Sequence, residues 1–567
     1  MRTVYQYIRP YLKMVIFCLV IKTLGGFTEL AIPSMLGRII DEDVPSGEMR
    51  RVLISGGIMV GFAFLTFLFN VIGNRISAKA SGLIARDLRY ALFCKTIYLD
   101  TQDTDKLGIS SLTSRLTSDT YNITSFISRL QRLGVKAPLM LIGGIAITLT
   151  IDARLALVLI AVMPLVCVTV YVITKKSIPI YTEEQILLDG IVKRVDETAS
   201  GIRVIKALSK GEYEKERFGE NSKLLASKEI KAGKLMSLTK PTTDFLLNIG
   251  LCGVIFVGAF LAMKYGENSA GKLLTFMTYF TIILNNMIMM TRIFVQMSRS
   301  IASAARIEEV LLTDRKLLES QENAKIEEPF IVFDNVSFSY NKRINNLDCA
   351  SFSVERGQTI GIIGSTGAGK TTVINLLLRL YDVDSGEIRI NGRNIKAIPK
   401  EELYSMFGVA FQNDFVPAGT VYENISFFRD LSVDLVNDAM TIAQAKDFVS
   451  SFDEGTDRHV TTRGTNISGG QRQRLLISRA IANDPEILIL DDSSSALDYK
   501  TDMNLRKALN SKINTTTFII AQRISSIKNA DIILVIDEGR IIGKGTHDFL
   551  MENVEEYRSI AKVQMGQ

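Results

Sequence analysis

A glycine-rich segment in the second half of the chain has the residue types that bind phosphate groups. It comprises Gly364, Ser365, Thr366, Gly367, Ala368, Gly369, Lys370, Thr371 and Thr372, and it follows the β-rich run Gln358 to Ile363. Glycines let backbone N–H groups converge on phosphate oxygens, the Lys370 ammonium can reach the β and γ phosphates, and the Thr371 hydroxyl can hold Mg²⁺. Because a strand precedes this loop and a helical stretch follows it, we expect ATP or GTP binding.

Two carboxylates follow a second apolar run, Ile487 to Leu490. A carboxylate at the tip of a buried strand suits a water-bridged contact to Mg²⁺, which is the part we assign to Asp491. Asp492 is then placed to orient or deprotonate the attacking water.

A third group of residues lies upstream of these carboxylates, at the expected start of a helix. Ser468, Gly469, Gly470 and Gln471 combine a hydroxyl with glycine amides. Such a helix start can bind an anion. The tetrad alone is a weak signal, but its position between a phosphate loop and an Asp-tipped strand strengthens it.

The elements that must position these groups alternate between strand and helix. Helical stretches separate several short β-rich runs, which favours an α/β domain with a mainly parallel sheet flanked by helices. The runs are Ile331 to Phe338, Gln358 to Ile363, Glu387 to Ile390 before an Asn391-Gly392 turn, Ile487 to Leu490, Thr516 to Ala521 and Ile532 to Ile536.

The first half of the chain has a different composition. It contains apolar runs long enough to cross a hydrocarbon core of ~30 Å, at about 12 to 38, 53 to 74, 134 to 151, 154 to 174, 244 to 263 and 273 to 296. Six such runs in half a chain predict a polytopic helical membrane domain rather than buried core helices. We expect domains at 1–312 (membrane), 313–329 (linker) and 330–567 (nucleotide-binding).

Lysine and arginine are concentrated in the long connections after the second and fourth runs, roughly 76 to 132 and 175 to 240. By the positive-inside rule, these connections and both termini face the cytoplasm. The net charge of +6 is explained by these residues, so no nucleic-acid partner is expected. The five cysteines form no CxxC pair, and we expect no disulfide or cysteine-ligated metal.

The same two connections are helix-like and should extend the spans into the cytoplasm. Loops between such helices could contact a soluble domain. The candidates are Tyr98 to Gly108, which contains Asp100, Asp103 and Asp105, and the stretch Pro179 to Glu184. The alternative is that both are solvated helix ends.

With these motifs in this order, nearly the whole chain resembles half-transporters of the ATP-binding cassette (ABC) exporter family. The resemblance implies that two such chains sandwich ATP, with the phosphate loop of one facing Ser468 to Gln471 of the other. It also implies that Tyr340 stacks on adenine, that Gln412 senses Mg²⁺ and the membrane domain, and that Asp498 communicates between the sites. Alternatively, Tyr340 covers a strand end, Gln412 is a solvated loop residue and Asp498 caps a helix.

Two positions depart from the family pattern. Asp492 stands where the family has glutamate, and Gln522 where it has histidine. A displacement near 1 Å at a reacting centre can lower a rate roughly a hundredfold, and an amide cannot accept a proton or carry positive charge near neutral pH. The pattern therefore resembles the degenerate-site subunit of heterodimeric bacterial multidrug exporters, whose partner would supply the missing glutamate and histidine.

The expected function is ATP-driven export of small amphiphilic or drug-like molecules across the cytoplasmic membrane. Polar or flexible residues within or near the spans are candidates for the substrate pathway: Glu29, Asp244, Asn285, Asn286 and Met287. Asn side chains in spans can also bond neighbouring helices, and methionines can simply pack. Alternative functions are a homodimeric exporter of lipid or peptide, and an ATP-gated channel or regulatory subunit.

Overall fold

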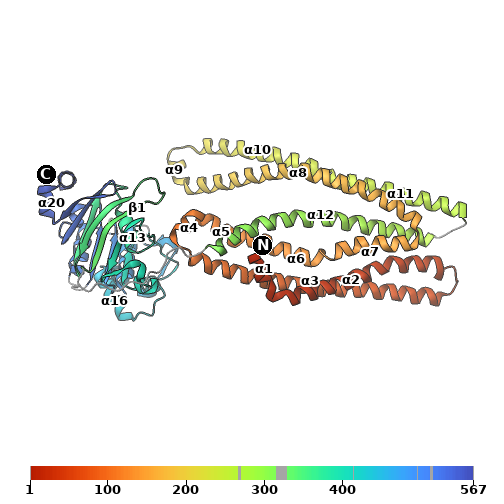
Figure 1. Ribbon diagram of the computed structural model, residues 1–567, viewed down its shortest axis with the longest axis horizontal. Coiled ribbons are helices and arrows are strands. Elements are labelled where there is room, and N and C mark those ends of the chain that lie inside the picture. The colour runs from red at the N-terminus through yellow and green to blue at the C-terminus, as the bar shows by residue number, and fades with distance from the viewer. Residues whose placement is uncertain are drawn as a thin grey trace. The chain divides into compact units, whose positions relative to one another are not determined.

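The computed structural model describes residues 2–265, 270–313, 329–412, 414–493, 496–510 and 515–565. The chain forms two compact units. A helical unit comprises Met1–Tyr98 and Gly108–Thr313, and a cassette unit comprises Leu99–Leu107 and Asp314–Gln567. Figure 1 shows long helices in the first unit and mixed strands and helices in the second. Residues 314–328 of the expected linker lie outside the described residues.

The helical unit is built from long helices that pack side by side. Helix α2 packs on α3, α12 packs on α6 and α7, and α10 and α11 lie along α8 (Figure 1). The bounds are α1 (Arg2–Ile8), α2 (Leu12–Arg38), α3 (Met49–Ile97), α5 (Ile109–Ser114), α6 (Thr120–Leu133), α7 (Lys136–Ile151), α8 (Ala153–Ser200), α9 (Ile202–Ala207), α10 (Gly211–Ser237), α11 (Thr239–Tyr265) and α12 (Ala270–Leu312).

Within the described residues, five helical segments are long and apolar enough to cross a membrane. They are Thr3–Asp43, Met49–Ile97, Ile109–Ile151, Ala153–Ser177 and Gly211–Leu261. These segments contain the first five apolar runs of the sequence. The sixth run, 273 to 296, lies in α12, where several side chains fall outside the described set. A sixth span therefore stays a prediction.

One expected loop is a helix. We predicted a turn between cytoplasmic helices near Pro179 to Glu184, but α8 continues through Pro179 to Ser200. The chain reverses later, around the short helix α9, between Gly201 and Gly211. A proline inside a helix removes one backbone donor without ending the helix when packing continues on both sides. Helix α8 packs along α10 and α11, which explains its continuity.

The other expected contact loop belongs to the cassette unit. Helix α4 (Thr101–Leu107) and Asp100 lie in the same compact unit as the strands. The Lys400 ammonium donates to Asp100 at 2.9 Å, and the Tyr381 hydroxyl donates to Asp105. Burial, together with this bond to Asp105, raises the pKa of Tyr381. Within the predicted segment Tyr98 to Gly108, residues Leu99–Leu107 therefore contact the soluble domain.

In the described part of the cassette the strands form three sheets. A six-stranded sheet has the order β12-β11-β3-β10-β9-β6, a four-stranded antiparallel sheet has the order β2-β1-β4-β5, and β7 pairs with β8. The strands are β1 (Ile331–Phe338), β2 (Leu347–Val354), β3 (Thr359–Gly364), β4 (Ser385–Ile390), β5 (Arg393–Asn394), β6 (Phe407–Ala410), β7 (Gly419–Thr420), β8 (His459–Val460), β9 (Ile487–Asp491), β10 (Thr516–Ile520), β11 (Ile532–Asp537) and β12 (Arg540–Gly545).

Helices flank these sheets. They are α13 (Lys370–Leu377), α14 (Lys400–Ser405), α15 (Val421–Ser426), α16 (Val433–Ile442), α17 (Lys446–Ser450), α18 (Gly469–Ile481), α19 (Tyr499–Asn510), α20 (His547–Asn553) and α21 (Glu555–Met565). Helix α18 packs against β6, α15 and α16, around a core cluster of its own that includes Leu475, Val436 and Ile425. The cassette therefore has a second core beside the one at the phosphate loop.

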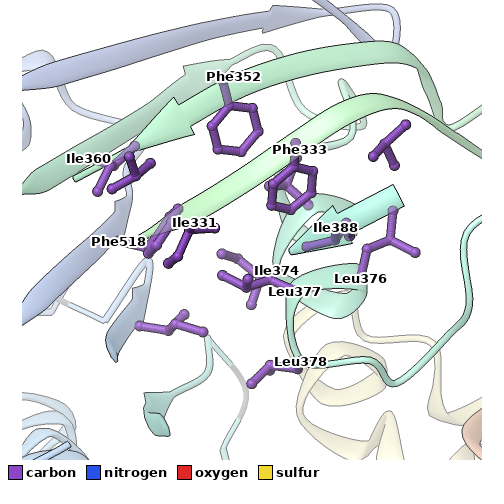
Figure 2. Close-up of a cluster of buried hydrophobic side chains, with 14 of the residues drawn as sticks. Ile331, Phe333, Phe352, Ile360, Ile374, Leu376, Leu377, Leu378, Ile388 and Phe518 are labelled. Atoms are coloured by element: carbon purple, nitrogen blue, oxygen red, sulfur yellow. The ribbon is translucent and has the colours of Figure 1, made fainter. Parts of the chain in front are cut away.

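The larger core fills the space between the two main sheets and α13. Figure 2 shows Phe333 and Phe352 side by side, with ring centroids 4.4 Å apart. Ile374 and Leu377 of α13 are fully buried in the same cluster. This packing fixes α13, and with it the end of the phosphate loop, against the sheet.

The parallel strands bring the chemical groups to one edge. Strands β3, β10 and β9 are neighbours, and Asp491 of β9 pairs in register with Ile520 of β10. The carboxyl ends of parallel strands meet at the same edge of a sheet, where ligands bind in α/β folds. Gly364, Asp491 and the segment after Ile520 are therefore placed together by topology.

Candidate functional site

The phosphate loop lies between β3 and α13 and its glycines are required by backbone geometry. A Cβ at Gly364 would lie 2.0 Å from the Ile536 carbonyl oxygen, and one at Gly369 would lie 2.4 Å from the Asn346 carbonyl oxygen. Gly367 and Gly369 have φ of +86° and +106°, a region that glycine adopts without strain. The loop therefore has the tight backbone that a phosphate cradle needs.

The Lys370 side chain bonds backbone carbonyl groups of the phosphate loop. The Lys370 ammonium donates to the carbonyl oxygens of Gly364 (2.9 Å) and Ser365 (2.7 Å). Burial lowers the pKa of Lys370, and the charges of Asp491 and Asp492 oppose this shift. Of the other predicted ATP contacts, Ala368 and Thr372 are buried while Ser365, Thr366 and Gly367 are exposed.

Oxygen ligands suited to Mg²⁺ meet at the start of α13. The Thr371 hydroxyl lies 3.5 Å from Oδ2 of Asp491, and hydroxyl and carboxylate oxygens are the ligands that Mg²⁺ prefers. Burial raises the pKa of Asp491, and the neighbouring charge of Asp492 raises it further. A cation would relieve both effects, so these residues fit a magnesium ion bound together with nucleotide phosphates.

The Asp492 carboxylate accepts hydrogen bonds from both amide side chains predicted at this site. Its Oδ2 accepts hydrogen bonds from Nε2 of Gln412 at 3.0 Å and from Nε2 of Gln522 at 2.9 Å. Its backbone φ is +48°, in the left-handed region that Asp tolerates better than most residues. Burial raises the pKa of Asp492. The sequence-predicted catalytic pair is thus in direct contact, and Gln412 joins it.

Tyr340 lies just after the end of β1 (Ile331–Phe338). Its ring meets the rings of Phe338 and Tyr381 edge-on, with centroids 4.9 and 5.0 Å away, and its hydroxyl accepts from Nδ2 of Asn375 at 3.0 Å. The side chain keeps 41% of its surface exposed. It both covers the strand end and offers exposed ring surface for a base.

Replacing Tyr340 with alanine is expected to weaken ATP binding about tenfold, because stacking of an aromatic ring on a base contributes ~1–3 kcal/mol. Tyr340→Phe keeps the ring and loses only the bond from Asn375, so it should bind nearly as tightly. Titration of the purified full-length chain with a fluorescent ATP analogue measures both. Equal affinity of the alanine variant would assign Tyr340 to strand-end packing alone.

Ser468, Gly469, Gly470 and Gln471, which we call the signature tetrad, form the N-cap and first turn of α18. Ser468 is the N-cap: its hydroxyl accepts from the Gln471 N–H at 3.2 Å, and the Gln471 side chain accepts from the Ser468 N–H at 2.9 Å. This capping box fixes the turn. The N–H groups of Gly469 and Gly470 lie at the positive end of the helix dipole. The tetrad belongs to the second core region, around α18, rather than to the phosphate-loop core.

Asp498 caps the helix that follows it. Its carboxylate accepts from the Thr501 N–H at 2.9 Å and the Thr501 hydroxyl at 2.7 Å, and these bonds lower its pKa. Gln473 of α18 accepts from the Ala496 N–H at 2.8 Å, which ties the signature helix to the loop before Asp498. Within one cassette, the contacts of Asp498 are those of a helix cap, the alternative to communication between the sites.

Of the five candidate pathway residues in the helical unit, three have side-chain partners and two are exposed. Asn286 donates to the Ile282 carbonyl one turn earlier and Met287 is buried beside Cys167, so both have structural partners. Asp244 and Asn285 are exposed. Glu29 forms an ion pair with Lys136 at 2.7 Å. Among the described residues, none of these contacts joins one candidate to another.

Sequence reasoning passed over one charged residue inside a span. Lys22 of α2 is only 3% exposed and its ammonium donates to Oδ1 of Asn70 and of Asn74, at 2.9 Å each. The available signal was a lysine in the middle of the first apolar run, since ionisable residues within membrane segments usually mark functional sites.

A polytopic helical unit joined to a cassette with a phosphate loop, an Asp-tipped strand and a Ser-Gly-Gly-Gln helix start defines an ATP-driven membrane transporter. Residues 15–287 match the family described as ABC transporter transmembrane region, and residues 347–495 match the family described as ABC transporter. The chain belongs to the ABC transporter family, and its fused membrane and ATP-binding domains make it an exporter of this family.

Relatives cover the full length of the chain. It is 31% identical over 571 residues to the uncharacterized ABC transporter ATP-binding protein YfiB of Bacillus subtilis, covering 100% of this chain and 99% of that protein. It is 29% identical over 565 residues to an ATP-dependent lipid A-core flippase of Albidiferax ferrireducens, covering 99% and 97%. Its fold is similar to that of a bacterial Atm1-family ABC exporter with ATP bound, with a TM-score of 0.84, 23% identity and coverage of 98% and 99%.

Proposed function

We propose that this chain is one half of a heterodimeric exporter of small amphiphilic or drug-like molecules in the cell membrane, with both termini and the cassette in the cytoplasm. ATP binding closes the two cassettes and turns the membrane domains outward. Hydrolysis, mainly at the site completed by the partner half, resets them. Mg²⁺ is held by Thr371, Gln412 and Asp491 together with the nucleotide.

The arrangement around Asp492 carries this proposal. Both groups that bond its Oδ2 are neutral amides, from Gln412 and Gln522. Neither amide can accept a proton or carry positive charge near neutral pH. Aspartate is also one methylene shorter than glutamate, and a displacement near 1 Å at a reacting centre lowers rates roughly a hundredfold. These features support ATP binding with slow hydrolysis at the site built on Lys370.

The signature tetrad supports the second part of the proposal. Its capping box is complete and its glycine amides stand at the start of a helix of 13 residues. Nothing in this turn departs from what an anion site needs. This chain can therefore complete a competent site whose phosphate loop, glutamate and histidine come from a partner half.

Asp492→Asn in the complex with its partner is expected to lower ATP turnover less than about twofold, because a poor general base contributes little to the rate. The purified chain alone should hydrolyse ATP slowly. Turnover of both preparations, measured by phosphate release in proteoliposomes, tests this. A large loss in the mixed complex would contradict the asymmetric assignment and favour a homodimer with two identical sites.

The relationship to a lipid A-core flippase, at 29% identity over nearly the whole chain, favours one alternative, a homodimeric lipid exporter. A second alternative is an ATP-gated channel or regulatory subunit. ATP-dependent dye accumulation against a gradient, in inside-out vesicles that contain the complex, would exclude the channel.

A further inference from the structure

The helical unit contains a cavity of about 470 Å³ between five of its helices, α2, α3, α6, α7 and α12. This volume lies within the range of small-molecule sites, ~300–1,000 Å³. Cationic and amide side chains line one part of it: Lys22, Asn70, Asn74, Arg129, Arg132 and Lys136. They come from α2, α3, α6 and the first residue of α7.

The charge at the centre of this lining is buried. Lys22 is 3% exposed, and the oxygens that meet its ammonium belong to neutral groups: Oδ1 of Asn70, Oδ1 of Asn74 and the Asn70 carbonyl. An ammonium group removed from water without a counter-charge is unfavourable. A mobile anion at this position would supply that charge.

The positive charges exceed the negative charges around the cavity. Glu29 pairs with Lys136. Among the residues that the structure describes, no carboxylate lies within ion-pair distance of Lys22, Arg129 or Arg132. Arg129 and Arg132 are exposed, so their guanidinium groups can reorient toward a ligand.

The rest of the lining is apolar. Leu133, Met289 and Ile293 complete the cavity wall. A site that places cations on one side and aliphatic side chains on the other matches a molecule with an acidic head and a hydrocarbon chain. Guanidinium groups bind phosphate oxygens in a bidentate geometry, which makes a phosphate head the best fit.

We propose that this cavity binds an anionic amphiphile, with its phosphate head against Lys22, Arg129 and Arg132 and its chain along Leu133, Met289 and Ile293. The inference rests on the proposed exporter function and narrows its cargo from amphiphilic or drug-like molecules to acidic ones. Binding at this site is the first step before the ATP-driven conformational change.

A tryptophan reporter makes the test direct, because the chain contains no tryptophan. Met289→Trp places the indole in the cavity wall, where Met289 is 43% exposed. The full-length chain is reconstituted in phosphatidylcholine liposomes and titrated with dodecyl phosphate without ATP. A saturable emission shift is expected. Dodecyltrimethylammonium, which has the same chain and the opposite charge, should give none.

The charge variants are made in the reporter background. Arg129→Gln combined with Arg132→Gln is expected to weaken dodecyl phosphate binding at least about tenfold, because two charge-assisted bonds are lost. Lys22→Met should weaken it as well. The Arg129 and Arg132 positions are exposed, so the double variant tests the site without disturbing a buried contact. Lys79→Gln, at an exposed position of α3 outside the cavity, should leave affinity unchanged.

Three results would overturn the inference: equal responses to both detergents, unchanged affinity in the double arginine variant, or displacement of dodecyl phosphate by excess inorganic phosphate. The last would mean that a free anion suffices. ATP-driven transport of a cationic dye by the complex, without dodecyl phosphate binding, would also reject the inference and leave the exporter proposal intact. Binding without any ATP-driven transport would reject the exporter proposal instead.

Discussion

Gly469→Asp is expected to lower ATP turnover of the complex between this chain and its partner at least about a hundredfold, the size of effect seen when a preorganised donor for a developing negative charge is lost. In the proposed arrangement the first turn of α18 faces the γ-phosphate held by the partner's phosphate loop. A carboxylate in that turn would oppose the phosphate charge directly.

The structure indicates that this variant folds. Among the described residues, a Cβ at Gly469 would have one neighbour within 4 Å, the Ala496 Cβ at 3.8 Å, which is an ordinary van der Waals contact. An acidic residue in the first turn also interacts favourably with the helix dipole. The loss of turnover would therefore come from the site and not from the stability of α18.

Gly469→Asn is the matched control, since asparagine has nearly the same shape without the charge. It is expected to retain most of the turnover. Phosphate release from proteoliposomes measures the rate, and thermal unfolding checks that both variants are equally stable. Equal rates for the two variants would contradict a phosphate contact at this turn and would reduce Ser468 to Gln471 to a helix cap.

The parallel strands of the cassette were largely predictable because buried parallel strands are continuous apolar runs. Among these parallel strands, β9 differs from the predicted run only by including Asp491. The antiparallel strand β1, Ile331–Phe338, also has the predicted bounds. Strands β2 and β12 were not predicted, since polar residues and positive-φ breaks interrupt their patterns, as at Cys349. Strand β6 is only four residues long, too short for periodicity to be seen.

The contacts at the candidate site could be predicted only in part. Lys370 and Thr371 lie just beyond β3, and Asp491 ends β9. These two parallel strands flank β10, so topology brings the three residues together at one edge of the sheet. That Gln412 and Gln522 share one oxygen of Asp492 depends on side-chain geometry that no spacing rule contains. The cavity around Lys22 joins residues from five helices. A lysine inside an apolar run was a local signal, but which side chains surround it depends on helix packing that the sequence does not show.

The combined substitution Asp492→Glu and Gln522→His is expected to raise ATP hydrolysis by the purified chain alone at least about tenfold. If two copies of this chain face one another in the purified protein, each supplies an intact signature tetrad to the other's site. Under the proposed function, the catalytic pair is then what limits the rate. The longer carboxylate reaches toward the attacking water, and the imidazole can carry the positive charge that an amide cannot.

The stability cost of Asp492→Glu depends on the backbone conformation at this position. Residue 492 has a φ of +48°, a left-handed conformation that costs most L-residues roughly 1–2 kcal/mol and that aspartate tolerates better than glutamate. That is small against the stability of a domain, ~5–15 kcal/mol, so the variant should fold.

Each single substitution should give a smaller gain in ATP hydrolysis than the pair, because base and positive charge act on the same transition state. Asp492→Asn combined with Gln522→His is the control without a base and should remain slow. If the Glu/His chain forms an ATP-dependent dimer but hydrolyses ATP no faster than the native chain, the catalytic pair is not what limits this site.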